Sequence, residues 1–357
     1  MEAKLDLSKT YAVALEGGGA KGAYQVGVWQ AMEEAGVRFN AVSGTSVGAL
    51  NGAFMAMGRL EEAKAIWENI RFSQVIEGDD ALLRSLFDGS FSFENLGEMA
   101  AYVLDTVRDG GLDVSPLRTL IQTSVDEDAL RASPVALYIM TYSLSDHKEL
   151  DIDVKTLPPG KIWEMLLASA YFPAFKNEPF SGGKRFTDGG VQDRVPIHSL
   201  ISRGYRDILV LRIFGFGVER RVKVPKGVRL TTIAPREDLG SVLRFDASHT
   251  RRIMRLGYFD GQRAIYGLTG EKYYVNRTMT EEEAYQALLS LRAPGESLRQ
   301  FHEKSLRQLA RRRRQREGDY YALFLAQLEH AAQAKGVEVF QVYGDRELLE
   351  LAGLAAD

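Results

Sequence analysis

The strongest constraint on the fold comes from residues 10–57, where two short runs suited to buried strands alternate with two helical patterns. The runs at Tyr11–Leu15 and Asn40–Ser43 have the length expected of such strands. A helical pattern follows each of them, over Gly22–Ala35 and Val47–Met57, and a glycine comes directly after each helix. Strands and helices that alternate at this spacing predict a parallel sheet with helices on both of its faces.

The rest of the chain extends this pattern and then departs from it. Further strands are predicted at Val135–Tyr142, Lys184–Phe186, Asp207–Phe214 and Val228–Ala234, and helices at Lys161–Ala170 and over residues 241–268. We therefore expect a three-layer α/β/α sandwich with a mostly parallel central sheet over residues 8–270. Residues 59–133 are interpreted as a helical, cap-like insertion in it. Residues 271–357 are predicted to form a mainly helical C-terminal region.

Composition excludes several classes of function. The chain of 357 residues has a formal net charge of −3, which gives no general attraction to nucleic acid. It has no cysteine, so disulfides, thiolate zinc sites and cysteine nucleophiles are ruled out. No cluster of His, Asp and Glu has metal-ligand spacing, and we expect neither a metal nor a cofactor. The sequence shows no signal peptide and no apolar stretch of about 20 residues, so we expect a cytoplasmic protein whose membrane contact, if any, is peripheral.

A glycine-rich loop, Gly17-Gly18-Gly19-Ala20-Lys21-Gly22, follows the first predicted strand. Gly17, Gly19 and Gly22 match the G-x-G-x-x-G pattern of a dinucleotide site, but the same loop also suits an anion cradle for acyl transfer. A dinucleotide site expects an acidic residue about 20 positions later, at the end of the second strand. That strand ends in Val42-Ser43-Gly44 instead. This disfavours nucleotide binding, which stays open as the alternative.

A candidate nucleophile lies in the second motif, Gly44-Thr45-Ser46-Val47-Gly48. It has the form G-x-S-x-G and falls between a predicted strand and a predicted helix. A serine on such a sharp turn projects its hydroxyl away from the sheet, and the flanking glycines Gly44 and Gly48 let the backbone turn. The N-terminus of the following helix favours an oxyanion nearby. A helix-capping serine is the structural alternative for Ser46.

The base that would activate such a serine is not evident among the five histidines. His198 is the one near another motif, and we interpret it as the start of a helix. That motif is Asp188-Gly189-Gly190, which follows a short predicted strand. An aspartate held by glycines at a strand end lies where α/β proteins build their sites. Taken alone, it is equally typical of an ordinary turn.

Taken together, the three motifs resemble the patatin-like phospholipase family in order and spacing, over about residues 10–215. The segment LLASAYFPAFKNEPF also resembles the stretch that precedes the aspartate of that family. The resemblance implies a patatin-like fold and a Ser-Asp dyad without histidine, with Ser46 as nucleophile and Asp188 as base. It implies an oxyanion hole at Gly17, Gly18 and Gly19. Lys21 would bind a head group or support the loop together with Gly22, and Gly189 and Gly190 complete the aspartate motif.

One position departs from the family pattern, because Arg194 stands where many relatives have asparagine. We expect the dyad to be unaffected, since that asparagine is interpreted as structural. The predicted function is therefore hydrolysis of lipid acyl esters, of the phospholipase A or lysophospholipase kind. A catalytically silent protein of the same fold is a further alternative.

The expected partner is a lipid or acyl-ester substrate, and two segments bear on membrane contact. In RIFGFGVERRVKVPK, Phe214 and Phe216 lie close to four basic residues, an arrangement that suits an anionic membrane surface. The basic run RRRRQR at residues 311–316 allows the same interpretation. A solvated basic face explains either segment equally simply, and we favour it here.

Overall fold

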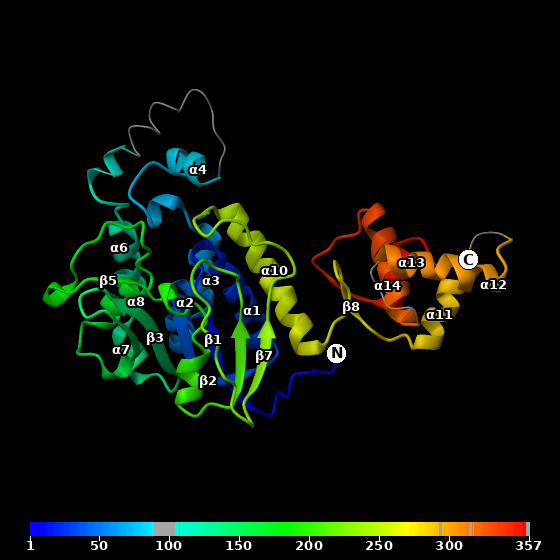
Figure 1. The fold of residues 1–357 in the computed structure, drawn as a ribbon, viewed down its shortest axis with the longest axis horizontal. Coiled ribbons are helices and arrows are strands. Elements are labelled where there is room, and N and C mark those ends of the chain that lie inside the picture. The colour runs from blue at the N-terminus through cyan, green and yellow to red at the C-terminus, as the bar shows by residue number, and fades with distance from the viewer. Residues whose placement is uncertain (89–103, 107, 293–294, 314–315, 317, 355–357) are drawn as a thin grey trace. The chain divides into compact units, whose positions relative to one another are not determined.

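The computed structural model describes the chain except residues 89–103, 107, 293–294, 314–315, 317 and 355–357 (Figure 1). The chain forms two compact units. One comprises Asp6–Gly261, and the other comprises Met1–Leu5 together with Gln262–Asp357. A domain boundary near residue 270 stays a prediction.

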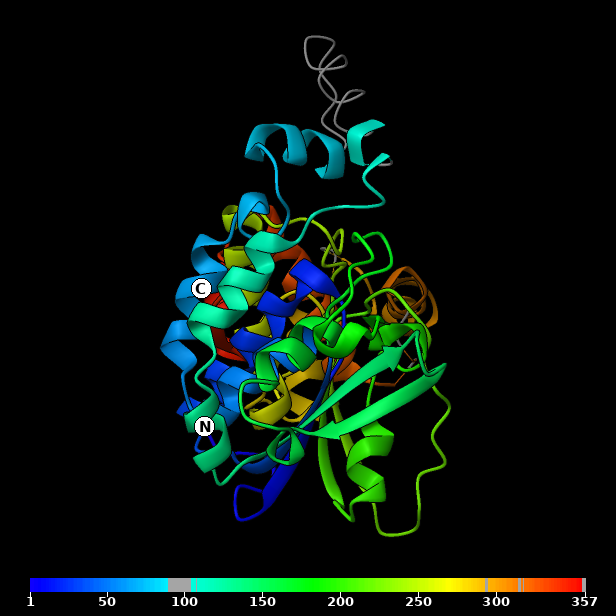
Figure 2. The same cartoon turned by 90° about the vertical axis from the view of Figure 1, so that its left-hand side faces the viewer.

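The larger unit is built on a seven-stranded sheet. Its strands are β1 (Thr10–Leu15), β2 (Arg38–Thr45), β3 (Ala136–Ser143), β4 (Lys148–Asp153), β5 (Phe186–Asp188), β6 (Asp207–Leu211) and β7 (Arg229–Ile233). The order is β4-β3-β2-β1-β6-β7, and β5 also pairs with β3. Strands β1, β2, β3, β6 and β7 are parallel, whereas β4 and β5 run antiparallel to β3 (Figure 2). The predicted, mostly parallel sheet is therefore confirmed.

Helices cover both faces of this sheet because side chains alternate along its strands. Ala12 and Ala14 of β1 face a cluster that includes Leu200 of helix α9 (Ile197–Ser202). On the opposite face, a Cβ added to Gly52 of α2 (Val47–Met57) would lie 3.6 Å from Leu15. The sheet thus forms the middle layer of the expected α/β/α sandwich.

The remaining helices of this unit surround the sheet. They are α1 (Ala23–Glu34), α3 (Leu60–Asn69), α4 (Asp80–Asp88), α6 (Ser115–Ser124), α7 (Glu127–Ala132), α8 (Ile162–Ser169) and α10 (Ala247–Tyr266), of which α10 continues beyond residue 261. Helices α3, α4, α6 and α7 occupy the described part of residues 59–133. The rest of that predicted insertion, residues 89–103 and 107, lies outside the described residues.

The sequence did not reveal strand β4. Its segment, KELDID, is exposed at the start and only partly buried beyond it, so it lacks the apolar run that marks the other strands. The strand expected over Asp207–Phe214 ends at Leu211, because the backbone amides from Ile213 onward donate to Glu16 instead of to a strand. The last helix of this unit begins at Ala247, later than the predicted residue 241.

The smaller unit is mainly helical, as expected. Its helices are α11 (Glu281–Ser290), α12 (Leu298–Gln300), a π-helical turn (Phe301–Leu306), α13 (Arg307–Arg313), α14 (Tyr320–Ala334) and α15 (Asp345–Leu351). They enclose a core of their own that includes Phe324, Leu328 and Leu348. A short parallel pair, β8 (Tyr274–Asn276) with β9 (Val342–Gly344), was not predicted. Across both units, no helix of the described chain has the length and apolar character needed to span a membrane.

Helices α1 and α10 touch backbone to backbone through glycines. A Cβ added to Gly27 would lie 1.8 Å from the carbonyl oxygen of Met254, and one added to Gly257 would lie 2.0 Å from that of Tyr24. The Tyr24 hydroxyl donates to Asp260 at 3.0 Å across the same contact. Since α1 follows the glycine-rich loop directly, this contact holds the helix that carries the loop.

We expect Gly257→Ala to destabilise the protein. The added methyl group would force the two helices apart, and such overpacking costs about 1–3 kcal/mol, more than the gain in helix propensity of about 1 kcal/mol. Chemical denaturation of the variant measures the loss. Gly344→Ala is the matched control, because its Cβ would meet nothing nearer than 4.0 Å. Equal stability of the Gly257→Ala and wild-type proteins would contradict the close packing described here.

Candidate active site

The three glycine-containing motifs meet at the carboxyl edge of the sheet. The glycine-rich loop follows β1, and Ser46 follows β2, which lies beside β1 in parallel. Asp188 ends β5, which runs antiparallel to β3 and so reaches this edge from the other direction. Ser46 and Asp188 are far apart in the sequence, and only the strand pairing brings them together.

Ser46 occupies a strained turn. Its backbone has φ 56° and ψ −129°, a conformation that is unusual for a residue with a Cβ. The turn needs glycine on both sides, because a Cβ on Gly44 would lie 2.3 Å from the carbonyl oxygen of Gly48, and one on Gly48 would lie 2.4 Å from that of Leu15. Strain of this kind costs about 1–3 kcal/mol and persists where the surroundings over-determine it.

A second serine holds this turn in place. The Ser46 amide donates to the hydroxyl of Ser169 at 2.9 Å, and that hydroxyl donates to the carbonyl oxygen of Met140 at 2.6 Å. Ser169 is fully buried at the end of α8. The turn at Ser46 is thus tied through α8 to strand β3. Ser169 lies in the segment LLASAYFP, whose resemblance to the family was the sequence signal for it.

Strand register places Asp188 beside Ser46. The last residue of β2, Thr45, pairs with Met140 of β3, and the next residue of β3, Thr141, pairs with Asp188 of β5. Strand β4 occupies the other edge of β3 over the same residues. Strand β5 therefore takes the position in the sheet that β2 leaves when the chain turns at Ser46.

The carboxyl group of Asp188 has an unusual proton affinity. Burial raises its pKa from 3.8 to about 6, although hydrogen bonds from the Ser46 hydroxyl and the Gly190 amide lower it in part. The Gly190 amide donates to Oδ1 at 2.7 Å. That bond fixes the orientation of the carboxyl group. A carboxylate with a pKa near 6 is a better base than an exposed aspartate.

Two glycines of the glycine-rich loop, Gly18 and Gly19, line the same cavity as Ser46. The amide of Gly17 donates to the carbonyl oxygen of Arg194 at 2.9 Å, so Gly17 is not a free donor. In the described chain, the amides of Gly18 and Gly19 have no protein acceptor. A Cβ on Gly17 would lie 3.2 Å from that of Ser46, which shows how closely the loop approaches the serine. Of the three predicted donors, Gly17 therefore has its amide engaged within the protein, and an oxyanion hole at Gly18 and Gly19 stays a prediction.

Lys21 supports the loop from within the protein. It is buried, and its ammonium group donates to the carbonyl oxygen of Phe214 at 2.9 Å. Of the two roles expected for Lys21, this geometry favours holding the loop over binding a head group. A Cβ on Gly22 would lie 2.4 Å from Val47, so Gly22 allows the loop to pack on the helix that follows Ser46.

A buried carboxylate, Glu16, anchors the other side of this loop. Glu16 is fully buried and immediately precedes the glycines. It accepts the amides of Ile213 and Phe214 at 2.7 and 3.1 Å, and it pairs with the guanidinium groups of Arg212 and Arg194 at 2.8 and 3.1 Å. A buried charge is tolerated when it is paired and hydrogen-bonded in this way. Sequence analysis missed Glu16, although a charged residue directly after a buried strand was a usable signal.

Arg194 is part of the same network, which explains the departure from the family pattern. Besides Glu16, its guanidinium group contacts Glu219 at 2.9 Å and the carbonyl oxygen of Gly215 at 2.7 Å. Its own backbone carbonyl accepts the amide of Gly17. Arg194 therefore links the segment after Asp188 to the glycine-rich loop and to the segment after β6. Arg194 is not among the residues that line the cavity beside Ser46.

A buried amide network holds both ends of the glycine-rich loop, and sequence analysis missed it as well. Gln25 of α1 donates to the carbonyl oxygen of Glu16 at 2.7 Å, and Asn51 of α2 donates to that of Gly22 at 2.9 Å. Asn51 also donates to Gln25 and accepts the indole N–H of Trp67 from α3. The helix that begins at Ser46 thus fixes the loop whose amides lie beside it.

Ser46 and Asp188 line an apolar cavity. Its volume is about 130 Å³, and its walls come mainly from α2, α3, α6 and the segments around residues 172 and 243. The lining includes Leu50, Phe54, Leu117, Ile121 and Phe172. Among the described lining residues, Asp188 is the one with a charge. Such a cavity suits an apolar chain whose reactive end lies at Ser46.

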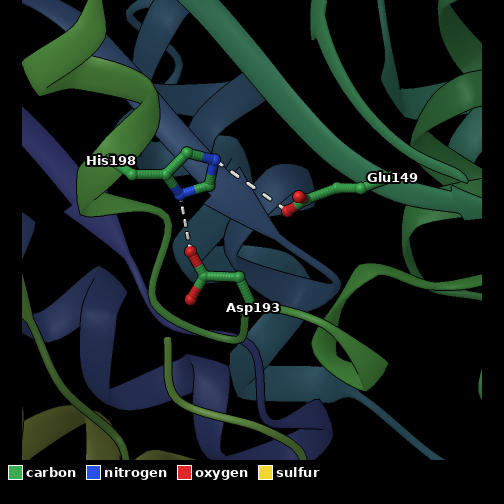
Figure 3. A group of neighbouring side chains, drawn as sticks. All are labelled: Glu149, Asp193 and His198. Atoms are coloured by element: carbon green, nitrogen blue, oxygen red, sulfur yellow. Dashed lines mark hydrogen bonds and ion pairs between the residues drawn. The ribbon is translucent and has the colours of Figure 1, made fainter. Parts of the chain in front are cut away.

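His198 has partners other than the serine (Figure 3). Its Nδ1 lies 2.6 Å from Oδ2 of Asp193, and its Nε2 lies 3.9 Å from Oε1 of Glu149. The three side chains form a group with metal-ligand character that sequence spacing did not reveal. The other carboxylate oxygen of Glu149 accepts a hydrogen bond from the guanidinium group of Arg220 at 2.9 Å. Only Nε2 of His198 and Oε1 of Glu149 are left to face an ion. Zinc sites have three or four protein ligands.

Comparisons with known proteins identify similar sequences. Patatin-like phospholipase domain-containing protein 7 of Mus musculus is 33% identical over 26% of this chain and 7% of its own length. Patatin-like phospholipase domain-containing protein 6 of Homo sapiens is 24% identical over 59% of this chain and 14% of its own length. The chain thus matches only a small part of these relatives.

A solved structure and a family profile complete the comparison. The crystal structure of VipD from Legionella pneumophila is 14% identical, with a TM-score of 0.45, over 97% of this chain and 83% of that chain. The sequence profile described as patatin-like phospholipase matches residues 13–201, more than half of the chain. That range contains the glycine-rich loop, the serine turn and the aspartate motif. The chain belongs to the patatin-like phospholipase family.

Proposed function

We propose that this protein is a serine hydrolase that cleaves acyl esters of lipids through Ser46 and Asp188. The observation that carries the proposal is the buried carboxylate of Asp188, with its raised pKa, against the hydroxyl of Ser46 in an apolar cavity. A serine hydroxyl needs a base to become nucleophilic, and here an aspartate takes the place of the usual histidine.

In the first step, Oγ of Ser46 attacks the ester carbonyl carbon and its proton passes to Oδ2 of Asp188. The other carboxyl oxygen, Oδ1, stays bonded to the Gly190 amide and keeps the group aligned. Since the pKa of Asp188 is about 6, the carboxylate is ionised at neutral pH and binds a proton more readily than an exposed aspartate would.

The carbonyl oxygen becomes negatively charged in this step and needs hydrogen-bond donors. We assign that role to the amides of Gly18 and Gly19, which have no protein acceptor in the described chain. The α2 N-terminus, at Ser46, adds a positive partial charge. One such donor typically contributes about 10²–10³-fold in rate. The loop is held in advance by Lys21 and Glu16, so its amides need not reorganise.

The attack of Ser46 produces a tetrahedral intermediate. This intermediate then collapses, and the alcohol leaves with the proton that Asp188 took up. The acyl group remains as an ester on Ser46, with its chain in the apolar cavity. In the second half of the reaction, Asp188 accepts a proton from a water molecule that attacks this ester. The fatty acid is released, and the serine regains its proton from Asp188.

The cavity indicates which part of the substrate is recognised. Its lining suits a hydrocarbon chain, and in the described lining the single charged group belongs to the dyad itself. A phosphate head group would find no cation among these lining residues. The substrate class that fits is an acyl lipid bound by its chain, which agrees with the phospholipase names of the relatives.

The alternative functions fit less well. A dinucleotide site needs an acidic group at the end of the second strand, whereas β2 ends in Thr45 and leads to the strained Ser46. A catalytically silent protein would have no need to hold Ser46 in a strained turn beside a buried carboxylate. Labelling of Ser46 by a fluorophosphonate probe separates an active protein from a silent one.

We expect Ser46→Ala and Asp188→Asn each to lower the kcat for a p-nitrophenyl acyl ester by about 10³-fold or more, since the members of a dyad act as a unit. A fluorophosphonate probe should label wild-type protein at Ser46, and Ser46→Ala should abolish the labelling. Ser124→Ala is the matched control, because Ser124 lines the same cavity but lies outside the dyad. Activity that survives Ser46→Ala would refute the proposal.

The pH dependence of the reaction follows from the raised pKa of Asp188. The base must be ionised, so kcat/KM should fall about tenfold per pH unit below pH 6 and level off above it. A series of stopped assays between pH 4.5 and 8 on a soluble ester measures the profile. A profile that is flat through pH 6 would show that Asp188 is not the base.

The same pKa predicts a pH-dependent stability that does not involve substrate. Because the folded-state pKa of Asp188 is raised, the folded protein binds this proton more tightly, and the resulting stabilisation is lost as the pH rises from about 4 to above 6. Asp188→Asn removes this dependence. The unfolding free energy of wild type relative to the variant should fall by up to about 3 kcal/mol between pH 4 and 7. A difference that is constant with pH would contradict the burial of the charge.

A further inference from the structure

The loop between β6 and β7, residues 212–228, exposes an unusual set of apolar side chains. Eight large hydrophobic residues are exposed on the described surface, and four of them belong to this one loop: Phe214, Phe216, Val218 and Val224. Phe216 is 67% exposed. A group of large exposed apolar side chains marks an interaction site, whereas single exposed apolar residues are normal on a protein surface.

The same loop carries cations that have no counter-ion in the described part of the chain. Arg221, Lys223 and Lys226 are exposed, and no ion pair joins them to another described residue. The remaining charges of the loop are paired, Glu219 with Arg194 and Arg212, and Arg220 with Glu149. The loop therefore offers three unpaired positive charges, although the chain as a whole is slightly acidic.

This loop lies at the mouth of the cavity. Phe216 is a lining residue, and its ring meets that of Phe172 edge to face at 5.9 Å between centroids. Phe172 and the exposed Pro173 belong to the lining as well. An apolar molecule that entered the cavity beside these residues would therefore pass the exposed side chains of the loop.

The backbone of the loop is fixed to the catalytic segments. The amide of Val218 donates to the carbonyl oxygen of Gly190 at 2.8 Å, and the carbonyl oxygen of Phe214 accepts Lys21. Phe214 is held at φ 48°, which is unfavourable for a bulky residue. These contacts fix the backbone that carries the exposed side chains of Phe214 and Val218.

We propose that residues 214–226 form a docking surface for an anionic phospholipid membrane. Phe214, Phe216 and Val218 enter the interface between head groups and acyl chains, while Arg221, Lys223 and Lys226 contact the anionic head groups. A protein docked in this way has its cavity mouth at the lipid surface. The inference rests on the proposed function only for the identity of the substrate, because docking itself requires no turnover.

Co-sedimentation with vesicles tests the docking surface directly. The full chain with Ser46→Ala binds without consuming the lipid, and vesicles of phosphatidylcholine alone are compared with vesicles containing phosphatidylglycerol. We expect binding to the anionic vesicles to be stronger and to weaken with salt. In the same background, Arg221→Glu/Lys223→Glu/Lys226→Glu should weaken it by about 100-fold or more.

The basic segment formed by the π-helical turn Phe301–Leu306 and helix α13 provides a matched control. Lys304→Glu/Arg307→Glu/Arg311→Glu makes the same change in charge at exposed positions of the other unit. If this variant loses vesicle binding while the loop variant keeps it, the proposal is overturned and the membrane contact belongs to that basic segment. Thermal unfolding of each variant checks that it is folded.

Apolar insertion is tested separately with Phe214→Ser/Val224→Ser, which keeps every charge. We expect it to weaken binding to both kinds of vesicle. It removes apolar area that would be buried in the membrane and leaves the electrostatic attraction to the head groups unchanged. Binding to neither kind of vesicle by the Ser46→Ala protein would overturn the proposal and leave the surface to a protein partner. A wild-type protein that docks but hydrolyses no ester would refute the proposed function alone.

Discussion

The site depends on the point at which β2 ends. Thr45 is its last residue, and beyond it the chain turns sharply at Ser46, so one edge of β3 would be left without a partner. Strand β5 fills that edge in the antiparallel direction, and its last residue, Asp188, pairs with Thr141. A single rule, that the backbone groups of a strand must be paired, thus places the carboxylate next to the hydroxyl.

The position of the glycine-rich loop depends on the pairing of a buried charge. Glu16 lies in the protein interior and needs partners, which are the guanidinium groups of Arg194 and Arg212 and the amides that follow β6. Those partners belong to the aspartate segment and to the β6–β7 loop. One buried carboxylate therefore connects the glycine-rich loop, the aspartate segment and the exposed loop at the cavity mouth. It explains why the amides of Gly18 and Gly19 lie in fixed positions.

Sequence reasoning reached some of these residues and missed others. Ser46 and Asp188 were predicted because their motifs carry local signals, a serine between glycines and an aspartate before glycines. Asn51 and Trp67 were missed, since an amide in a small-residue helix and an indole in an amphipathic helix have no local pattern that marks them as partners. Strand β4 was missed because its side chains are only partly buried, so it lacks the apolar run of the inner strands.

The sequence by itself determined the alternation of strands and helices, the sharp turn at Ser46 and the family of the chain, because each of these depends on residues close together in the chain. The tertiary structure alone decided that Gly17 donates to Arg194 and that Lys21 is buried. It also decided that the pKa of Asp188 is raised to about 6. These properties depend on desolvation and on hydrogen-bond partners distant in sequence, which arise only when the segments pack together.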